Sequence, residues 1–326
     1  MNVLFITTEW PTEARPYDAP FIREYAFALQ EAGIHVGVFH FKGQGNPLNY
    51  LRAWRKIRKS DFWQKADILH AHWGQSAILG LFSRKPMVIT FHGSDLQGIV
   101  NQNDNYTIRG KILVAMSKWI AKQADRVIVV SERLKTLLSH DIQSVEVIPM
   151  GIDLSIFKPL DQAECRQSLG LDPDIRYVLF ASDPERREKR YKLAMEATNL
   201  LNAEHTAQKV ELLVVNNQPH YKMPEYLNAC DVLLLTSSHE GSPVIIKEAL
   251  ACNLPIVSVD VGDVSERISG IKGCYLCPDD EVETIVKFLK KAIAKNSRVN
   301  GLSSVQSYAW EIVSQQTITI YQKCLE

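Results

Sequence analysis

The sequence predicts an α/β protein made of two doubly wound domains that face a central cleft. Two observations lead to this prediction. Short apolar runs alternate with amphipathic helical stretches, and the alternation occurs twice, on either side of a stretch without periodicity. The length of 326 residues also suits two domains of about 150 residues each. Sheets of this kind bind ligands at the carboxyl ends of their strands, so we expect the functional site in the cleft.

In the first half, six apolar runs are expected to form a parallel sheet. These strands are Val3–Thr7, His35–Phe41, Ile68–His70, Met87–Phe91, Arg126–Val130 and Val145–Ile148. Helical periodicity fills the stretches between them. The expected helices are Phe21–Ala32, Leu48–Lys59, Gln75–Phe82, Tyr106–Lys122 and Glu132–Ser139.

The break between the halves falls at Pro149–Pro159, which holds two prolines and a glycine and has no periodicity. The expected domains are therefore 1–155 and 156–306, followed by one long helix at 307–326 that spans Ser307–Cys324. Five strands are expected after the break: Arg176–Ala181, Val210–Val215, Val232–Thr236, Ile256–Val259 and Gly273–Leu276. Four helices lie among them: Lys189–Ala203, Met223–Ala229, Val244–Cys252 and Glu281–Ala294.

Composition excludes several functional classes. Basic and acidic residues balance at 37 each, which argues against a nucleic-acid-binding protein. The six cysteines are scattered and do not form a disulfide framework, and the lone Cys274–Cys277 pair has no second pair with which to bind zinc. The first residues lack the basic leader of a signal peptide, and no apolar run is long enough to span a bilayer. We therefore expect a cytoplasmic protein.

The most informative stretch is His239–Asp263, which follows an apolar strand and opens a helix at Pro243. Gly241 lets the backbone approach a ligand closely, and a helix N-terminus suits a phosphate group. Glu240 lies in the loop before the helix, and Glu248 lies inside it. Eight helical residues span ~12 Å, whereas the two carboxylates of a glycosidase lie ~5–9 Å apart. The two carboxylates are therefore interpreted as contacts to different parts of one long ligand.

This stretch resembles the donor-site signature of glycosyltransferase family four, in which two glutamates are separated by seven residues. The resemblance covers nearly the whole chain, because further family motifs follow in the expected order. They resemble the runs Asp67–His72, Val88–Asp95, Ala124–Ser131 and Val147–Asp153. The resemblance implies the two-domain GT-B fold, with a terminal helix that crosses back to the N-terminal domain.

The resemblance also implies roles for individual residues. Glu240 would hold hydroxyls of the donor sugar and steady its reacting end, while Glu248 would bind the ribose. His92 would lie beside the sugar ring, contributed by the N-terminal domain. Backbone contacts to sugar and phosphate would come from Gly241, Ser242, Pro243 and Val244. Further donor contacts are expected from Asn216 and Ala19, and acceptor-side residues from Asp95 and His72.

The diphosphate is expected to meet cations from the run Ser182–Arg190. The family places a lysine here, which Lys189 matches, and an arginine nearer the strand, where this chain has Ser182 and Asp183. Arg186 or Arg187 is expected to replace it. Fixed cations and a helix N-terminus stabilise the charge that develops on a departing nucleoside diphosphate. The family usually needs no metal, so no metal or other cofactor is expected.

Two departures from the family pattern concern the nucleotide. The family often has glycines in the loop after the first strand, whereas this chain has Tyr17, Asp18, Ala19 and Pro20 there. The stretch 214–229 is shorter than the loop with which many relatives bracket the base. The identity of the base therefore does not follow from the resemblance.

The expected function is transfer of a hexose-type sugar, with retention, from a nucleoside diphosphate sugar to a hydroxyl acceptor. The setting is assembly of a glycan, lipopolysaccharide or exopolysaccharide, with a glycan or lipid-linked acceptor. Two alternatives remain: a sugar-nucleotide 2-epimerase on the same scaffold, and a non-catalytic nucleotide-sugar-binding partner subunit. The epimerase would act on the donor alone, because it needs no acceptor.

A basic amphipathic helix within residues 48–63 suggests a second partner. On a helical wheel Arg52, Arg55, Lys56, Arg58 and Lys59 share one face, and Tyr50, Leu51, Ala53, Trp54 and Ile57 lie on the other. This pattern is expected either of a helix packed on its sheet or of a peripheral contact with an anionic inner membrane surface.

Overall fold

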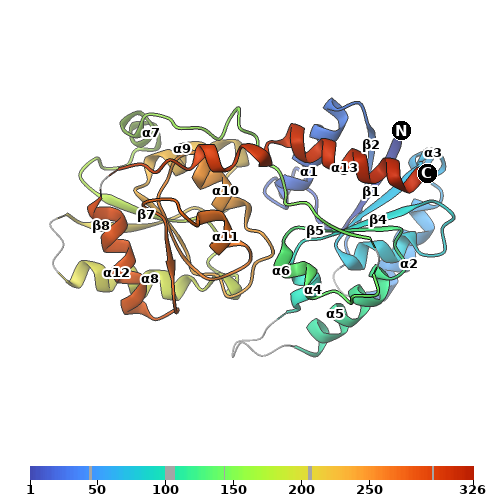
Figure 1. The fold of residues 1–326 in the computed structure, drawn as a ribbon, viewed down its shortest axis with the longest axis horizontal. Coiled ribbons are helices and arrows are strands. Elements are labelled where there is room, and N and C mark those ends of the chain that lie inside the picture. Colours follow the sequence, from blue (N-terminus) through green and yellow to red (C-terminus); the bar gives the residue numbers. More distant parts are fainter. Residues whose placement is uncertain (44–45, 100–106, 143, 205–207, 296) are drawn as a thin grey trace. The chain divides into compact units, whose positions relative to one another are not determined.

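The computed structural model describes residues 1–43, 46–99, 107–142, 144–204, 208–295 and 297–326. It divides the chain into two compact units. Unit 1 consists of Met1–Gly151 and Trp310–Glu326, and unit 2 consists of Ile152–Ala309. Each unit is a parallel sheet with helices on both faces (Figure 1). The fold is of the GT-B class.

Unit 1 is built on a six-stranded sheet in the order β2-β1-β3-β4-β5-β6, and all its paired strands are parallel. The strands are β1 (Asn2–Thr7), β2 (His35–His40), β3 (Ile68–His72), β4 (Met87–Phe91), β5 (Arg126–Val129) and β6 (Val145–Val147). The helices are α1 (Pro20–Glu31), α2 (Pro47–Ile57), α3 (Asp61–Lys65), η1 (Gly74–Gly80), α4 (Ser94–Gln97), α5 (Ile108–Ala121), α6 (Glu132–Lys135) and α13 (Trp310–Leu325). Residues of β3 and β4 are buried throughout, as expected of central strands covered on both faces.

Unit 2 has a five-stranded parallel sheet in the order β11-β10-β9-β7-β8. Its strands are β7 (Arg176–Phe180), β8 (Val210–Val214), β9 (Val232–Leu235), β10 (Ile256–Val259) and β11 (Tyr275–Cys277). Its α-helices are α7 (Gln162–Leu169), α8 (Tyr191–Ala203), α9 (Met223–Ala229), α10 (Val244–Ala251), α11 (Val264–Ile268) and α12 (Val282–Ala294). Short 3₁₀ turns are η2 (Arg187–Lys189), η3 (His220–Lys222), η4 (Leu302–Ser304) and η5 (Gln306–Tyr308).

The last helix, α13, completes unit 1. Its Trp310 ring stacks on Tyr25 of α1 at 5.4 Å between centroids, and the Tyr321 hydroxyl lies 2.6 Å from Nδ1 of His70. Gly151 permits this arrangement, because a Cβ at that position would overlap the ring of Trp310. The chain passes from unit 1 to unit 2 at residue 152 and returns after residue 309. These two connections are hydrogen-bonded to each other, because the Ile152 N–H donates to the Tyr308 carbonyl at 2.8 Å.

All the expected strands are present, with ends within two residues of the predicted ones. The helical segment expected near Gln75–Phe82 is present as the 3₁₀ helix η1, which begins at Gly74 and ends at Gly80. These glycines let the segment lie close to its neighbours: a Cβ at Gly74 would meet the Ser117 side chain at 2.5 Å. The first residue of the expected helix Tyr106–Lys122 lies outside the described residues.

The helical wheel of 48–63 was partly wrong. Only Ala53 and Ile57 of the expected inner face are buried, whereas Leu51 and Trp54 are exposed. Arg58 is not on a solvated face: its guanidinium lies over the rings of Trp54 at 5.0 Å and Trp63 at 4.5 Å. It also donates to the Leu81 carbonyl at 3.1 Å, so it fixes the turn after η1.

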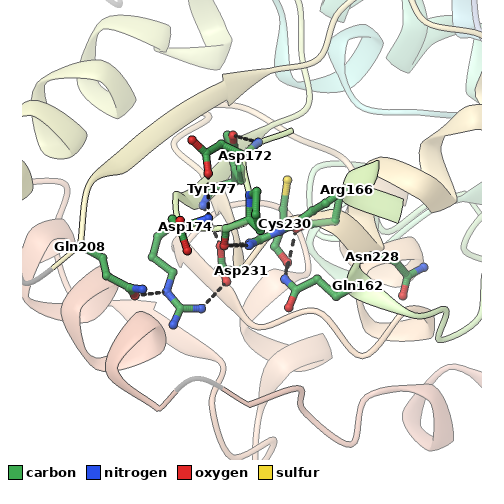
Figure 2. Close-up of polar contacts among 12 residues, drawn as sticks. Gln162, Arg166, Asp172, Asp174, Tyr177, Gln208, Asn228, Cys230 and Asp231 are labelled. Atoms are coloured by element: carbon green, nitrogen blue, oxygen red, sulfur yellow. Dashed lines mark hydrogen bonds and ion pairs between the residues drawn. The ribbon is translucent and has the colours of Figure 1, made fainter. Parts of the chain in front are cut away.

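A buried ion-pair cluster joins α7 to the amino ends of β7 and β9 (Figure 2). Asp231 accepts from Arg166 at 2.8 Å, from Arg176 at 3.0 Å and from the Tyr177 backbone N–H at 2.7 Å. Arg166 donates further to the carbonyls of residues 173 and 229. Because it lies at the amino ends of the strands, opposite the edge where such sheets bind ligands, we assign this cluster to stability.

Candidate active site

The loop between β9 and α10 carries the glutamate motif. Strand β9 is fully buried, and α10 begins at Val244. Pro243 is the N-cap residue, with a φ of −66°, rather than the first helical residue as expected. It offers no side-chain acceptor to the N–H groups of the first turn, which therefore suit an anionic ligand. Gly262, at a φ of +59°, packs against the carbonyl of Gly241, and the absence of a Cβ allows this contact.

Glu240 and Lys189 form an ion pair, with 2.5 Å between Nζ and Oε1. Each side chain is 13% exposed, so the pair is largely sheltered from water. The backbone of the lysine turn is fixed to the end of β9: the Thr236 hydroxyl donates to the Lys189 carbonyl, and the Ser238 N–H donates to the Glu188 carbonyl, both at 2.8 Å. The structure therefore brings together the two residues expected to hold the sugar and the diphosphate.

The two arginines expected to replace the family's arginine lie at the surface of unit 2. Arg186 is exposed and pairs with Glu188 of its own turn, with 2.5 Å between NH2 and Oε1. Arg187 is also exposed. Sequence reasoning did not single out Arg190, which follows Lys189 directly and has a φ of 49°. Its guanidinium donates to the Thr236 carbonyl at 2.5 Å and pairs with Asp280. In the sequence, the only indication of a role for Arg190 was its position in the same basic run as Lys189.

Glu248 is buried in α10, and its Oε1 accepts from Nε2 of His220 at 2.7 Å. The His220 ring lies 5.2 Å from that of Phe157, which is fully buried. Asn216 is half-buried after β8. His220 lies in the short stretch after β8, where the sequence placed the remnant of a base-binding loop, but its pairing with Glu248 was not foreseen.

A second polar cluster supports the start of α10. The Ser242 hydroxyl donates to Asp263 at 2.8 Å, and Asp263 pairs with Arg267 at 2.7 Å. Arg267 in turn lies over the Tyr308 ring at 4.5 Å. Lys247 is fully buried, 5.6 Å from the same ring, and burial lowers the pKa of its ammonium group to about 8. These contacts fix Ser242 and hence the backbone of the proposed phosphate site.

In unit 1, His70, His72 and His92 form a ladder of rings. His72 stacks between the other two, and its Nδ1 lies 3.1 Å from Nε2 of His92. Burial lowers the pKa of His70 and of His92 to about 3 and holds that of His72 well below its usual value. All three imidazoles are therefore neutral near pH 7. His92 can offer a hydrogen bond to a ligand but carries no charge.

Asp95, expected on the acceptor side, is fully buried and holds backbone. Its carboxylate accepts from the N–H groups of Gly93 at 3.0 Å and Gly74 at 3.2 Å. Burial raises its pKa to about 6, although these hydrogen bonds act in the opposite direction. Asp95 therefore joins the loop after β4, which carries His92, to the start of η1.

Ala19 is the N-cap residue of α1 and has a φ of 44° and a ψ of 56°. This left-handed conformation is the one that glycine adopts most readily. Ala19 is therefore one of the few non-glycine residues with a positive φ among the described residues.

No group of three or more potential metal ligands occurs among the residues that the structure describes. The six cysteines are unpaired thiols, and Cys274 and Cys277 lie at β11, as the strand interpretation predicted. Over the described ranges, none of the helices combines the length and apolarity needed to cross a membrane.

Comparison with known proteins supports the two-unit assignment. Residues 2–156 match the model "Glycosyltransferase Family 4", and residues 196–295 match "Glycosyl transferases group 1". The "Putative teichuronic acid biosynthesis glycosyltransferase TuaC" of Bacillus subtilis is 30% identical, over 81% of this chain and 82% of its own length. A D-inositol 3-phosphate glycosyltransferase of Kribbella flavida is 23% identical, over 80% of this chain and 72% of its own length.

Solved structures show the same fold. A sucrose-phosphate synthase of Thermosynechococcus elongatus superposes with a TM-score of 0.78 at 17% identity and covers 99% of both chains. HepE of Anabaena, solved in complex with UDP and glucose, has a TM-score of 0.70 at 16% identity, over 99% of this chain and 100% of its own.

Proposed function

Because this chain belongs to glycosyltransferase family 4, we propose that it moves a hexose-type sugar from a nucleoside diphosphate sugar to a hydroxyl acceptor, with retention at the anomeric carbon. One observation carries the proposal. The sheltered Lys189–Glu240 pair joins the turn η2, which follows β7, to the loop that leads to the N-terminus of α10, and Glu248 is buried further along that helix. A cation, a carboxylate proposed to bind hydroxyls and a helix N-terminus proposed to bind phosphate therefore come from two contacting segments of unit 2.

In the proposed reaction the bond between the anomeric carbon and the diphosphate oxygen breaks, and its electron pair leaves with the nucleoside diphosphate. Lys189 and the first-turn N–H groups of α10 stabilise this charge. Glu240 holds Lys189 in place and orients the sugar hydroxyls. The acceptor hydroxyl attacks the same face of the sugar and gives its proton to the departing phosphate. His92 and the backbone at Ala19 are proposed as further donor contacts.

Glu248 is proposed to bind the ribose, with His220 as its positioning residue. One carboxylate oxygen accepts from His220, and a carboxylate has capacity for further donors such as ribose hydroxyls. Glu248→Ala is expected to weaken nucleotide binding by roughly 1–3 kcal/mol, the cost of losing hydrogen bonds to a charged group. Isothermal titration with the preferred nucleoside diphosphate measures this effect. Glu225→Ala, on the neighbouring helix α9, is the matched control, and unchanged affinity in a folded Glu248→Ala protein would contradict the assignment.

In the proposed reaction, cationic side chains of the protein neutralise the charge of the diphosphate, a task that a divalent metal ion performs in other enzymes. We therefore expect EDTA to leave transfer activity intact, within the error of an initial-rate assay. A loss of activity that Mg²⁺ or Mn²⁺ restores would show that a divalent ion bridges the diphosphate instead.

A UDP-sugar is the proposed donor, because the structural relative HepE was solved with UDP and with UDP-glucose. The proposed setting is polysaccharide assembly, as in the name of the Bacillus relative. A thermal-shift panel of nucleoside diphosphates identifies the base, since a bound ligand stabilises the fold by RT ln(1 + [L]/Kd). Incubation with donor alone separates the transferase from an epimerase, which would convert the sugar without an acceptor.

A glycan or lipid-linked acceptor is proposed for the same reason. We further propose that the protein works in the cytoplasm, with peripheral contact to the inner membrane surface through residues 48–63. The exposed Arg52, Arg55, Lys56 and Lys59 support this contact, whereas Arg58 is engaged with the two tryptophans.

A further inference from the structure

Helix α5 exposes a stripe of large apolar side chains. Ile108 is 77% exposed, Ile112 is 62% exposed and Trp119 is 51% exposed. These positions are spaced by four and seven residues, so they follow one side of the helix. The buried positions are instead mostly small: Gly110, Ser117, Ile120 and Ala121. The helix therefore directs its largest apolar side chains away from the core of unit 1.

Packing fixes this orientation of α5. A Cβ at Gly110 would meet the backbone of Ile99 at 2.5 Å, so a larger residue does not fit on the inner side. The Thr107 hydroxyl accepts from the Gly110 N–H at 2.9 Å and caps the helix. A rotation that buried Ile112 or Trp119 would break these contacts. The exposed stripe is thus a feature of the folded unit.

The turn after η1 contributes a further exposed apolar side chain, that of Phe82, which is 94% exposed. Its φ of 60° is rare for a residue other than glycine and costs free energy. The preceding Leu81 carbonyl accepts from Arg58, which supports the turn. An aromatic ring is therefore presented to the surroundings at the tip of a constrained turn.

These segments lie on the same face of the unit 1 sheet. Segment η1, which leads to Phe82, packs against both α2 and α5. The strand order places β2 on one side of β1 and β3 to β6 on the other, so right-handed crossovers put α1 on one face and α2, η1 and α5 on the opposite face. Figure 1 shows α13 with α1, away from α5. Helix α2 adds the exposed Leu48, Leu51 and Trp54.

The segments that carry these side chains are rich in basic residues. The chain as a whole has 37 basic and 37 acidic residues, but the segments 46–60, 81–86 and 107–122 contain basic residues and no acidic one. Exposed cations on the three segments are Arg52, Arg55, Lys56, Lys59, Arg84, Arg109, Lys111 and Lys122, of which Lys122 pairs with Asp141. Large apolar side chains bordered by cations are typical of helices that lie in the interface of an anionic bilayer.

We propose that α5 and Phe82 insert their apolar side chains into the headgroup region of an anionic membrane, while the cations of α2 attract the protein to it. The stripe on α5 is a separate contact from the one proposed for 48–63. The role of this contact, which is to bring the enzyme to a lipid-linked acceptor, rests on the proposed function.

Vesicle flotation tests the proposal. The wild-type protein is expected to float with vesicles of phosphatidylglycerol and phosphatidylcholine and to be absent from phosphatidylcholine alone. Part of the binding should persist at 0.5 M salt, because apolar insertion is not screened. The variant Ile108→Ser, Ile112→Ser, Trp119→Ser should bind at least about 10²-fold more weakly, since each side chain loses much of its apolar transfer free energy.

The matched control replaces exposed apolar residues on the opposite face of unit 1: Phe27→Ser on α1 and Ile312→Ser on α13. It should bind as the wild type does. A charge-reversal variant, Arg52→Glu, Arg55→Glu, Lys56→Glu, should lose the salt-sensitive part of binding. All variants are checked by circular dichroism and thermal unfolding.

Wild-type affinity of the triple serine variant would overturn the role of α5 and leave 48–63 as the contact. An unbound wild-type protein on anionic vesicles at low salt would overturn both membrane contacts. Neither result would contradict the proposed sugar transfer, because transfer to a water-soluble acceptor or hydrolysis of the donor is measured without vesicles.

Discussion

Lys189→Ala is expected to lower kcat by about 10²–10³, the effect of removing one group that stabilises transition-state charge. The lysine ammonium lies 2.5 Å from Glu240 in a sheltered position, so a water molecule in the cavity left by the substitution cannot replace its fixed charge. KM for the donor should rise less than kcat falls, because the diphosphate gains charge as it departs. Initial rates over a range of donor concentrations separate the two effects.

Lys192→Ala is the matched control, since Lys192 is an exposed lysine on α8, close in sequence. Arg186→Ala and Arg190→Ala then show which arginine shares the task. We expect Arg190→Ala to lower kcat more than Arg186→Ala, because the guanidinium of Arg190 is held at the end of β9 whereas Arg186 is exposed. A folded Lys189→Ala enzyme with nearly normal kcat/KM would mean that another cation stabilises the leaving group.

Asp231→Ala is expected to destabilise unit 2 by about 3–5 kcal/mol, the cost of leaving buried charges without their partner. The Asp231 side chain is 8% exposed and neutralises both Arg166 and Arg176 (Figure 2). Its removal also leaves the Tyr177 N–H without its acceptor. Because the chain has two units, amide hydrogen exchange within β7 and β9 is a better measure than a single melting temperature.

Asp141→Ala provides the control, because the Asp141–Lys122 pair is exposed and should contribute little. Exchange rates in β7 and β9 that are unchanged by Asp231→Ala would show that water or backbone shifts compensate the two arginines. Catalysis by the surviving folded fraction should remain normal, since the cluster lies at the amino ends of the strands.

The strands could be predicted because both of their faces are buried, so each strand appears in the sequence as a continuous apolar run. Helix α7 could not, because its inner face carries Arg166, which is buried only through its pairing with Asp231, 65 residues further along the chain. A periodicity analysis treats an arginine as a surface residue. The 3₁₀ form of η1 was missed for a similar reason, since close packing at Gly74 is set by Ser117 of another element.

The candidate site shows the same division. The motif positions placed Glu240, Glu248 and Lys189, and the structure adds the pairing of Glu240 with Lys189. The partnership of His220 with Glu248 depends on how two loops fold toward each other, which spacing alone does not reveal. Asp95 was expected at the acceptor side, but its buried carboxylate holds the backbone of two loops.

The contribution of α13 to unit 1 has a consequence for the order of events during translation. Unit 2 is continuous in sequence, so all of its residues are synthesised before those of α13. Synthesis of unit 1 begins first, but the unit lacks Trp310 and Tyr321, which contact Tyr25 and His70, until α13 has been synthesised. The domain whose synthesis begins first is therefore completed last, and the side of its sheet that α13 covers is exposed in the interval.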